Sequence, residues 1–259
     1  KQVQATMAAG EEDVAKLTAA AKQMGATTRY SASEAAEALN YLALAGYNAD
    51  QACQSLPQVL ALAQAGGMDL AYASDLATDA MSALGLGISD LSRFTDQMAR
   101  TAQKSNTSVS QLGEAILTVG GTARQLAGGT VELNTQLGIL ADNGIKGAEG
   151  GTALRNIILS LTAPTDQAAR LMQAYGLSCY DANGNLRGTE EIFRDLNAVL
   201  GTMTQQQRSE VLSQLFNKVD LKAAEALLAN CTDRYDELSQ AVTDSQGATQ
   251  AMAATMESG

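Results

Sequence analysis

The chain has 259 residues, of which 46% are hydrophobic but only 4% aromatic, and its formal net charge is −11. This length is enough for one large domain or two small ones, and the aliphatic composition requires a core of Ala, Leu, Ile, Val and Met. The negative charge argues against a broad surface that binds nucleic acid or anionic membranes.

The three cysteines, Cys53, Cys179 and Cys231, lie far apart, and the chain has no histidine. This pattern argues against a zinc site and indicates reduced, partly buried thiols in a protein made in a cytoplasm. Without histidine, no Ser-His-Asp or Cys-His catalytic site is expected. No apolar run approaches about 20 residues and no signal peptide is recognisable, so we expect no membrane span. Because the chain begins with Lys1, we expect a segment of a longer protein.

Hydrophobic residues in the first part of the chain recur at intervals of three and four, which is typical of amphipathic helices. Ser31 or Ser33 can cap the second of these helices, with Glu34 or Glu37 in its first turn. The predicted helices cover about 6–24, from about 31 to Gly46, from about 50 to Gly66-Gly67, about 69–84 and about 88–104.

The next segment repeats this plan when the sequence is shifted by 77 residues. A polar helix start, an apolar stripe and a closing break recur without a gap, which predicts two related helical units at about 28–84 and 105–161. Chance agreement between helices rich in Ala and Leu is the alternative. The matched positions are Ser33 with Ser110, Glu37 with Glu114, Ala38 with Ala115, Leu39 with Ile116, Leu42 with Val119, Leu56 with Leu133, and Leu60 with Leu137.

The stretch from Tyr180 to Gly188 departs from the helical pattern. Its Asn-Gly pair is a strong signal for a tight turn, so a small β-hairpin is predicted near 180–188. Helices are predicted to resume at about 189–201, with Thr189 as the cap, and then at 204–216 and 219–229.

The C-terminal part has a heptad pattern. Its seam consists of Tyr235, Leu238, Val242, Ser245, Thr249, Met252 and Met256. This spacing predicts either the start of a long helix, which could self-associate as a coiled coil, or one amphipathic helix folded onto the rest of the chain.

Four glycines, Lys146 and Thr152 lie in the stretch 144–155, which raises the question of a phosphate-binding loop. A P-loop has the pattern GxxxxGK followed by Ser or Thr, between a strand and a helix. Here the lysine precedes the glycine pair at 150–151, and the preceding residues have a helical pattern. We therefore expect a joint in which Gly144 ends one helix and Thr152 lies near the start of another.

A calcium loop is suggested by Asp181, Asn183 and Asn185, which match its positions one, three and five. Leu186 and Ile192 stand where that loop requires glycine and glutamate, so a turn accounts for the three residues better.

A glycosidase would need a glutamate in a cleft. Glu34, Glu37 and Glu114 instead lie at predicted helix starts, where capping and the helix dipole account for them. We therefore predict no catalytic, cofactor-binding or metal-ligating residue, and no enzymatic activity.

The predicted fold is all-α, a multi-helix bundle with an internal helical repeat and one small β-hairpin. Two prolines and many alanines favour this class. The predicted parts are an N-terminal helix at 1–27, repeat units at 28–104 and 105–178, a hairpin with a helical subdomain at 179–230, and the start of a long, coiled-coil-like helix at 231–259.

Several stretches resemble the core region of phage tail tape measure proteins. They are Tyr30 to Gly46, Leu60 to Leu86, Asn143 to Pro164, the DANGNLR turn at 181–187, and Gln205 to Leu228. In the family's order they cover nearly the whole chain. One departure is Asn217 after Phe216, where family members often have glycine, and this departure concerns only the local turn.

The resemblance implies a structural segment of a bacteriophage or prophage tail tape measure protein, which sets tail length and leaves the tube during DNA ejection. It implies the tail tube protein, the tail assembly chaperones and the tail tip proteins as partners. It also implies location in the tail lumen of the virion, after a cytoplasmic stage in the bacterial host. A helical adaptor or secreted effector that binds a partner protein is the alternative.

Overall fold

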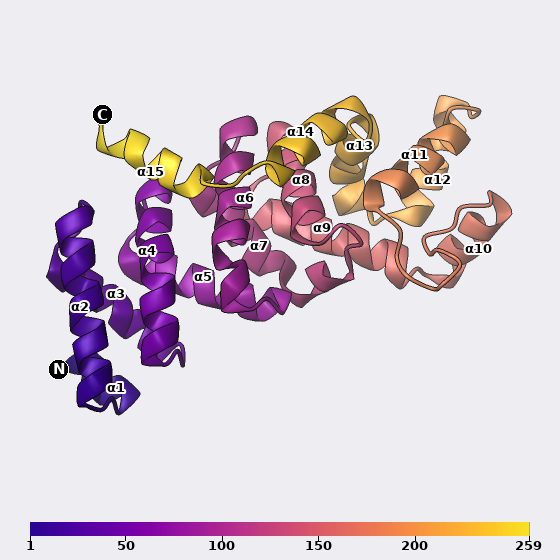
Figure 1. Ribbon diagram of the computed structural model, residues 1–259. Helices are drawn as coiled ribbons and strands as arrows, with labels where there is room; N and C mark the ends of the chain where they lie inside the picture. Colours follow the sequence, from indigo (N-terminus) through magenta and orange to yellow (C-terminus); the bar gives the residue numbers. More distant parts are fainter. Residues whose placement is uncertain (259) are drawn as a thin grey trace. The chain divides into compact units, whose positions relative to one another are not determined.

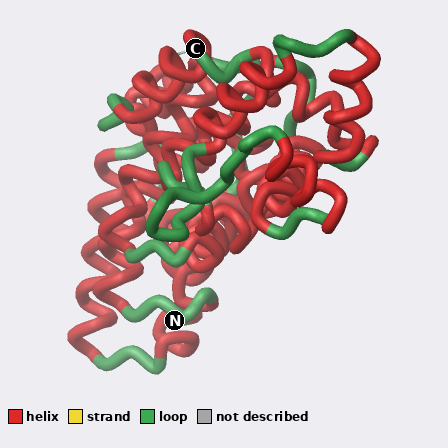
Figure 2. Tube along the Cα trace, turned by 90° about the vertical axis from the view of Figure 1, so that its right-hand side faces the viewer, coloured by secondary structure: helices red, strands yellow, loops and turns green. Residues whose placement is uncertain are grey.

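The computed structural model describes residues 1–258, and their regular structure is helical (Figure 1). These residues contain no β-strand, so the tube in Figure 2 shows only helices and loops. The α-helices are α1 (Gln2–Met7), α2 (Glu11–Thr27), α3 (Ala32–Leu44), α4 (Ala49–Gly66), α5 (Leu70–Leu84), α6 (Leu91–Lys104), α7 (Val109–Val119), α8 (Gly129–Asp142), α9 (Gly147–Thr162), α10 (Asp166–Ala174), α11 (Thr189–Leu200), α12 (Gln205–Leu215), α13 (Leu221–Ala229), α14 (Asp233–Thr243) and α15 (Ala248–Glu257). The 3-10 helices are η1 (Ile88–Asp90), η2 (Gly120–Gln125) and η3 (Lys218–Asp220).

The predicted all-α class is confirmed. Within residues 1–258, no helix combines the length and apolar character needed to cross a membrane.

The chain divides into two compact units, and the first consists of Lys1–Ala99 with the C-terminal residues from Ser245 onward. In this unit α4 packs against α2, α3, α5 and α15 (Figure 1). The helix predicted over about 6–24 is interrupted at Gly10, which separates α1 from α2. Small and aliphatic side chains let the helices pack closely without aromatic residues. The buried hydrophobic residues of α4 are Ala49, Ala52, Leu56, Val59, Leu60, Leu62, Ala63 and Ala65.

Local sequence signals determine where these helices begin and end. Both α3 and α4 begin with a capping box, in which Ser31 pairs with Glu34 and Asn48 pairs with Gln51. After α4, Gly67 adopts the left-handed conformation at φ 59°, which glycine reaches without steric cost. Ser31 is thus the cap among the two candidate serines, Ser31 and Ser33, and the glycine break agrees with the predicted end of the helix.

The second unit comprises Arg100–Asp244. Here α7 and α9 form a closely packed pair, and α8 contacts α9, α13 and α14. Further along the chain, α11 buries Phe193, whose ring stacks on Phe216 with a centroid distance of 6.1 Å and an interplanar angle of 24°. Such aromatic pairs contribute beyond the area that they bury, so this part of the unit has a large apolar anchor.

Helices recur at the interval of 77 residues noticed in the sequence. Capping boxes at Ser31 and Ser108 precede α3 and α7, while α5 and α9 begin at Leu70 and Gly147. Within the first unit α3, α4 and α5 contact one another, and within the second α7, α8 and α9 do the same.

The β-hairpin predicted near 180–188 is wrong. One isolated antiparallel bridge, between Tyr180 and Leu186, is all the β-pairing found among the described residues of this loop. The carboxylate of Asp181 accepts hydrogen bonds from two backbone N–H groups of the turn and closes it locally. Since no third strand adjoins the pair, a two-stranded ribbon would gain little stability here.

The heptad pattern at the C-terminus is divided between two helices. α14 ends at Thr243 and α15 begins at Ala248, and Gly247 between them has the left-handed conformation at φ 77°. α15 lies against α4 within the first unit (Figure 1). A single long helix is therefore not the arrangement of these residues.

Candidate functional site

The glycine-rich stretch at 144–155 acts as a joint between helices. Gly144 follows α8 with φ 80°, and α9 begins at Gly147. A Cβ atom placed on Gly151 would lie 2.3 Å from the carbonyl oxygen of Ala115. The missing side chain therefore lets α9 approach the backbone of α7 closely.

The two cationic side chains of this stretch bind backbone carbonyls of the same unit. Lys146 Nζ donates to the Asn106 carbonyl at 3.0 Å, and Arg155 donates to the Thr118 carbonyl at 3.4 Å. Both side chains thus hold neighbouring segments together, as expected of a packing joint.

Asp181 organises the loop that resembles a calcium site. Its Oδ1 accepts from the N–H groups of Asn183 at 2.8 Å and Asn185 at 2.9 Å. The hydrogen bonds from Asn185 are the main reason that the pKa of Asp181 is lowered. This carboxylate therefore stabilises the turn.

The glutamates singled out in the sequence have local structural roles. Glu34 accepts from the N–H of Ser31 at 2.7 Å, and this bond lowers the pKa of Glu34. Glu37 accepts from the Tyr41 hydroxyl at 2.8 Å. The carboxylate of Glu114 lies beside the start of α9. A Cβ atom placed on Gly147 would be 2.8 Å from this carboxylate.

The three cysteines are free thiols. Cys179 and Cys231 are buried and Cys53 is partly exposed. Burial raises the pKa of all three, which favours the neutral and unreactive thiol. Within residues 1–258, no group of three or more acidic or cysteine side chains is arranged to hold a metal ion.

The first unit contains a buried carboxylate that caps a helix far away in the sequence. We call Asp96 of α6, with Gly247 and Thr249, the Asp96 clamp. Asp96 is 5% exposed and accepts from the N–H of Gly247 at 2.8 Å, the N–H of Thr249 at 3.0 Å and the Thr249 hydroxyl at 2.6 Å. Because the N-cap residue of α15 is a glycine without a side chain, Asp96 satisfies the free N–H groups instead.

The second unit contains a similar arrangement, the Glu132 clamp, formed by Glu132, Gly128, Gln136 and Thr189. Glu132 of α8 is 1% exposed and accepts from both the N–H and the hydroxyl of Thr189 at 2.7 Å, and from the N–H of Gly128 at 2.7 Å. Gln136 donates to the same hydroxyl at 2.7 Å. The N-cap of α11 is Gly188, so the prediction that Thr189 is the cap is wrong by one residue. Thr189 is held by Glu132 instead.

Two more ionisable groups lie near the Glu132 clamp. Burial raises the pKa of Glu190, and the charge of Glu132 adds to the rise. Burial also raises the pKa of the Tyr235 phenol, with further contributions from the charges of Glu190 and Glu132. These shifts are a consequence of placing two carboxylates in a poorly hydrated space.

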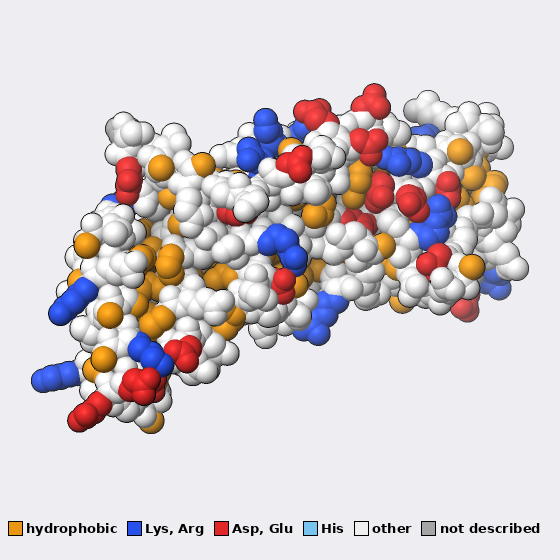
Figure 3. Space-filling model, in the orientation of Figure 1, with side chains coloured by type: hydrophobic (Ala, Val, Ile, Leu, Met, Phe, Trp, Pro, Cys, Tyr) orange, Lys and Arg blue, Asp and Glu red, His pale blue; other side chains and the backbone are white. Residues whose placement is uncertain are grey.

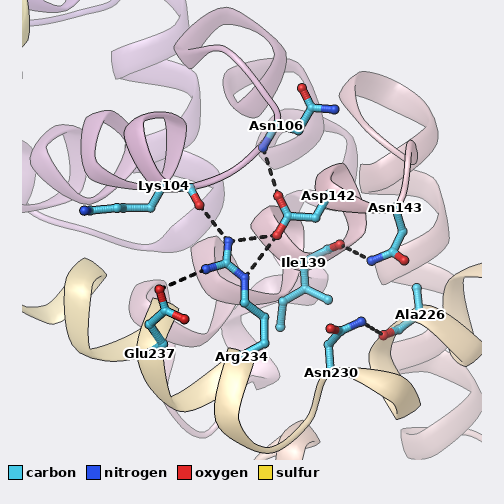
Figure 4. Close-up of polar contacts among 9 residues, drawn as sticks. All are labelled: Lys104, Asn106, Ile139, Asp142, Asn143, Ala226, Asn230, Arg234 and Glu237. Atoms are coloured by element: carbon cyan, nitrogen blue, oxygen red, sulfur yellow. Dashed lines mark hydrogen bonds and ion pairs between the residues drawn. The ribbon is translucent and has the colours of Figure 1, made fainter.

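A third polar cluster fixes the start of α14 in the second unit (Figure 4). Arg234 donates to Asp142 Oδ2 at 2.8 and 3.1 Å and to the Lys104 carbonyl at 2.6 Å. The other oxygen of Asp142 accepts from the N–H of Asn106 at 2.9 Å. Glu237 lies 3.6 Å from the guanidinium and completes the cluster. Through these contacts α14 holds the end of α8 and the loop between α6 and α7.

These three clusters have structural roles. The carboxylate oxygens accept from backbone, hydroxyl and guanidinium donors of the same chain, which positions helix ends. No direct signal for the two clamps is visible in the sequence, because each carboxylate lies within a helical pattern and the threonine that it binds is 57 or 153 positions away. Glycine at the start of α11 and α15, where a capping side chain is usual, is the one indirect signal.

Comparison with curated proteins finds two relatives from phages. The chain is 33% identical over 255 residues to the "Tape measure protein" of Pneumococcus phage Dp-1, covering 98% of this chain and 22% of that protein. It is 27% identical over 243 residues to the "Probable tape measure protein" of Escherichia phage P2, covering 92% of this chain and 29% of that protein. The chain thus spans less than a third of the length of either relative. No solved structure matches it.

A protein-family model described as "Phage-related minor tail protein" matches residues 18–217. This range includes α3 to α12, and therefore both the glycine joint and the Glu132 clamp. Because the match covers well over half of the sequence, the chain belongs to the family of phage-related minor tail proteins.

Proposed function

We propose that this chain is a structural, non-enzymatic segment of a tail tape measure protein, which sets tail length during assembly and leaves the tube during DNA ejection. The observation that carries the proposal is the match to a protein named "Tape measure protein" along 98% of this chain. No observation favours the helical adaptor or effector.

The fold supports a mechanical role. An α-helix rises about 1.5 Å per residue, so helical chains convert residue number into length. Here the helices are short and pack into two units, which favours a folded module beside any extended region of the full protein. The buried carboxylates of Glu132 and Asp96 position helix ends, a role that concerns packing and not turnover.

The proposed partners are the tail tube protein, the tail assembly chaperones and the tail tip proteins, and the proposed location is the tail lumen after assembly in the host cytoplasm. The net charge of −11 is consistent with a surface that does not bind tightly to DNA as the DNA passes through the tail tube. On the face shown in Figure 3, acidic and basic side chains are interspersed without one large basic patch. Tight binding of this segment to duplex DNA at physiological salt would contradict the proposal that its surface avoids DNA.

We also propose that 28–104 and 105–178 descend from one duplicated helical unit. The capping boxes at Ser31 and Ser108 support this, as do the equivalent starts of α5 and α9. The remaining proposed parts are 1–27, 179–230 and 231–259.

Tail morphology tests the proposed function. The phage gene that encodes this segment would be replaced by a version without residues 1–259, and lysates would be examined by electron microscopy. We expect tails to be absent or altered in length, and the wild-type segment supplied within the full gene should restore them. Infectious particles with tails of normal length would contradict the proposal.

A further inference from the structure

The attachment of α15 to the first unit is mostly polar. Its buried residues are Ala248, Thr249 and Ala253, whose side chains are small. Apolar burial, which usually holds a helix in place, therefore contributes little here. α11 in the second unit differs, because it buries Ile192, Phe193, Leu196 and Leu200 in addition to Thr189.

The surface beneath α15 also supplies polar partners. Gln64 donates to the Ala253 carbonyl at 2.8 Å, and Gln250 donates to Gln58 at 2.8 Å. Gln58 in turn donates to the hydroxyl of Thr95, one residue before Asp96. If α15 moved away, water could replace each of these polar partners. The apolar side chains of Met24, Pro57 and Leu60, which lie beside α15, would become more exposed as well.

The sequence of α15 also fits a second arrangement. The heptad seam that starts at Tyr235 in α14 continues through Ser245 and Thr249 to Met256 without a change of spacing. Only the stretch Asp244–Gly247 interrupts the helix, and Gly247 there has φ 77°. A helix needs no left-handed residue, so joining α14 and α15 requires helical backbone angles at Gly247 and also at Asp244, which has φ −92° and ψ 46°.

We propose that α15 is a detachable strap. It leaves α4 and α6 by local opening, with the Asp96 clamp as the last strong contact, and then continues α14 as one helix from Asp233 to Glu257, with Gly247 as the hinge. This inference does not depend on the proposed role in the tail.

Hydrogen exchange of the intact chain tests the strap. We expect the amides of α15 to exchange through an opening that leaves α4 and α11 protected. Asp96→Asn should increase the exchange of α15 by about tenfold or more, since hydrogen bonds to a charged acceptor are replaced by weaker ones. Glu132→Gln is the matched variant, and it should leave the protection of α15 unchanged. The proposal would be overturned if the amides of α15 exchanged only when those of α4 also exchanged, in the wild type and in Asp96→Asn alike.

The hinge has its own test. Gly247→Ala penalises the left-handed turn and favours the continuous helix, so the open population should rise by roughly thirtyfold. The amides of 245–247 should then gain protection while Gln64 loses its contact with α15. Gly184→Ala, at φ 81° in an unrelated turn, is the control and should not affect α15. If Gly247→Ala left α15 bound and 245–247 unprotected, the continuous helix would be excluded.

Discussion

The Asp96 clamp and the Glu132 clamp use the same chemistry with different surroundings. In each, a buried carboxylate accepts from the N–H and the hydroxyl of a threonine near the start of a helix whose N-cap is glycine. α11 adds four large apolar residues to its clamp, whereas α15 adds only two buried alanines. The comparison teaches that a polar cap determines where a helix starts, while apolar burial determines how firmly the helix is held.

The largest expected effect comes from removing the apolar anchor of α11. Phe193→Ala should reduce the free energy of unfolding by about 3–5 kcal/mol, because Phe193 is fully buried and stacks on Phe216. Urea denaturation followed by circular dichroism measures this change. Ala253→Gly in α15 is the counterpart, and if the two variants lost equal stability the contrast between α11 and α15 would be refuted.

The next effect concerns the Glu132 clamp itself. Glu132→Gln should cost about 2–3 kcal/mol in the same assay, because a buried charged acceptor with three donors is replaced by an amide whose N–H₂ faces some of those donors. Glu225→Gln, at an exposed position of α13, should be nearly neutral. Equal stability of the two variants would mean that the clamp contributes nothing.

The sequence predicts local features of this fold well and long-range ones poorly. The capping serine at 31 and the break at Gly67 follow from interactions within a few residues, so they could be predicted. The clamp partners of Asp96 lie more than 150 positions away, which no periodicity reveals. The hairpin prediction failed because no further strand supports the bridge between Tyr180 and Leu186, and the heptad pattern could not show the break at Gly247.

A smaller effect is expected at the cluster in Figure 4, which is partly exposed. Arg234→Lys keeps the charge but cannot bind Asp142 and the Lys104 carbonyl together, so we expect a loss of about 1–2 kcal/mol. Arg170→Lys on the exposed side of α10 is the control. A loss no greater than that of the control would show that the start of α14 is held by packing alone.

The smallest effect is pH-dependent and concerns Glu190. Its pKa is raised in the folded state, so the ionised carboxylate lowers stability above that pKa, and the penalty disappears as the pH falls below the ordinary value of 4.5. Glu190→Gln should therefore stabilise the chain slightly at pH 7, with a difference that shrinks toward pH 4. Thermal unfolding at several pH values measures it, and a constant difference across this range would argue against the assigned cause.

Limited proteolysis of the intact chain with a protease of broad specificity tests most directly whether these helices form stably packed units. We predict first cleavage in the loop between α14 and α15, around 244–247, and a resistant product that contains the second unit. Digestion throughout the chain, without a persistent fragment, would contradict the account.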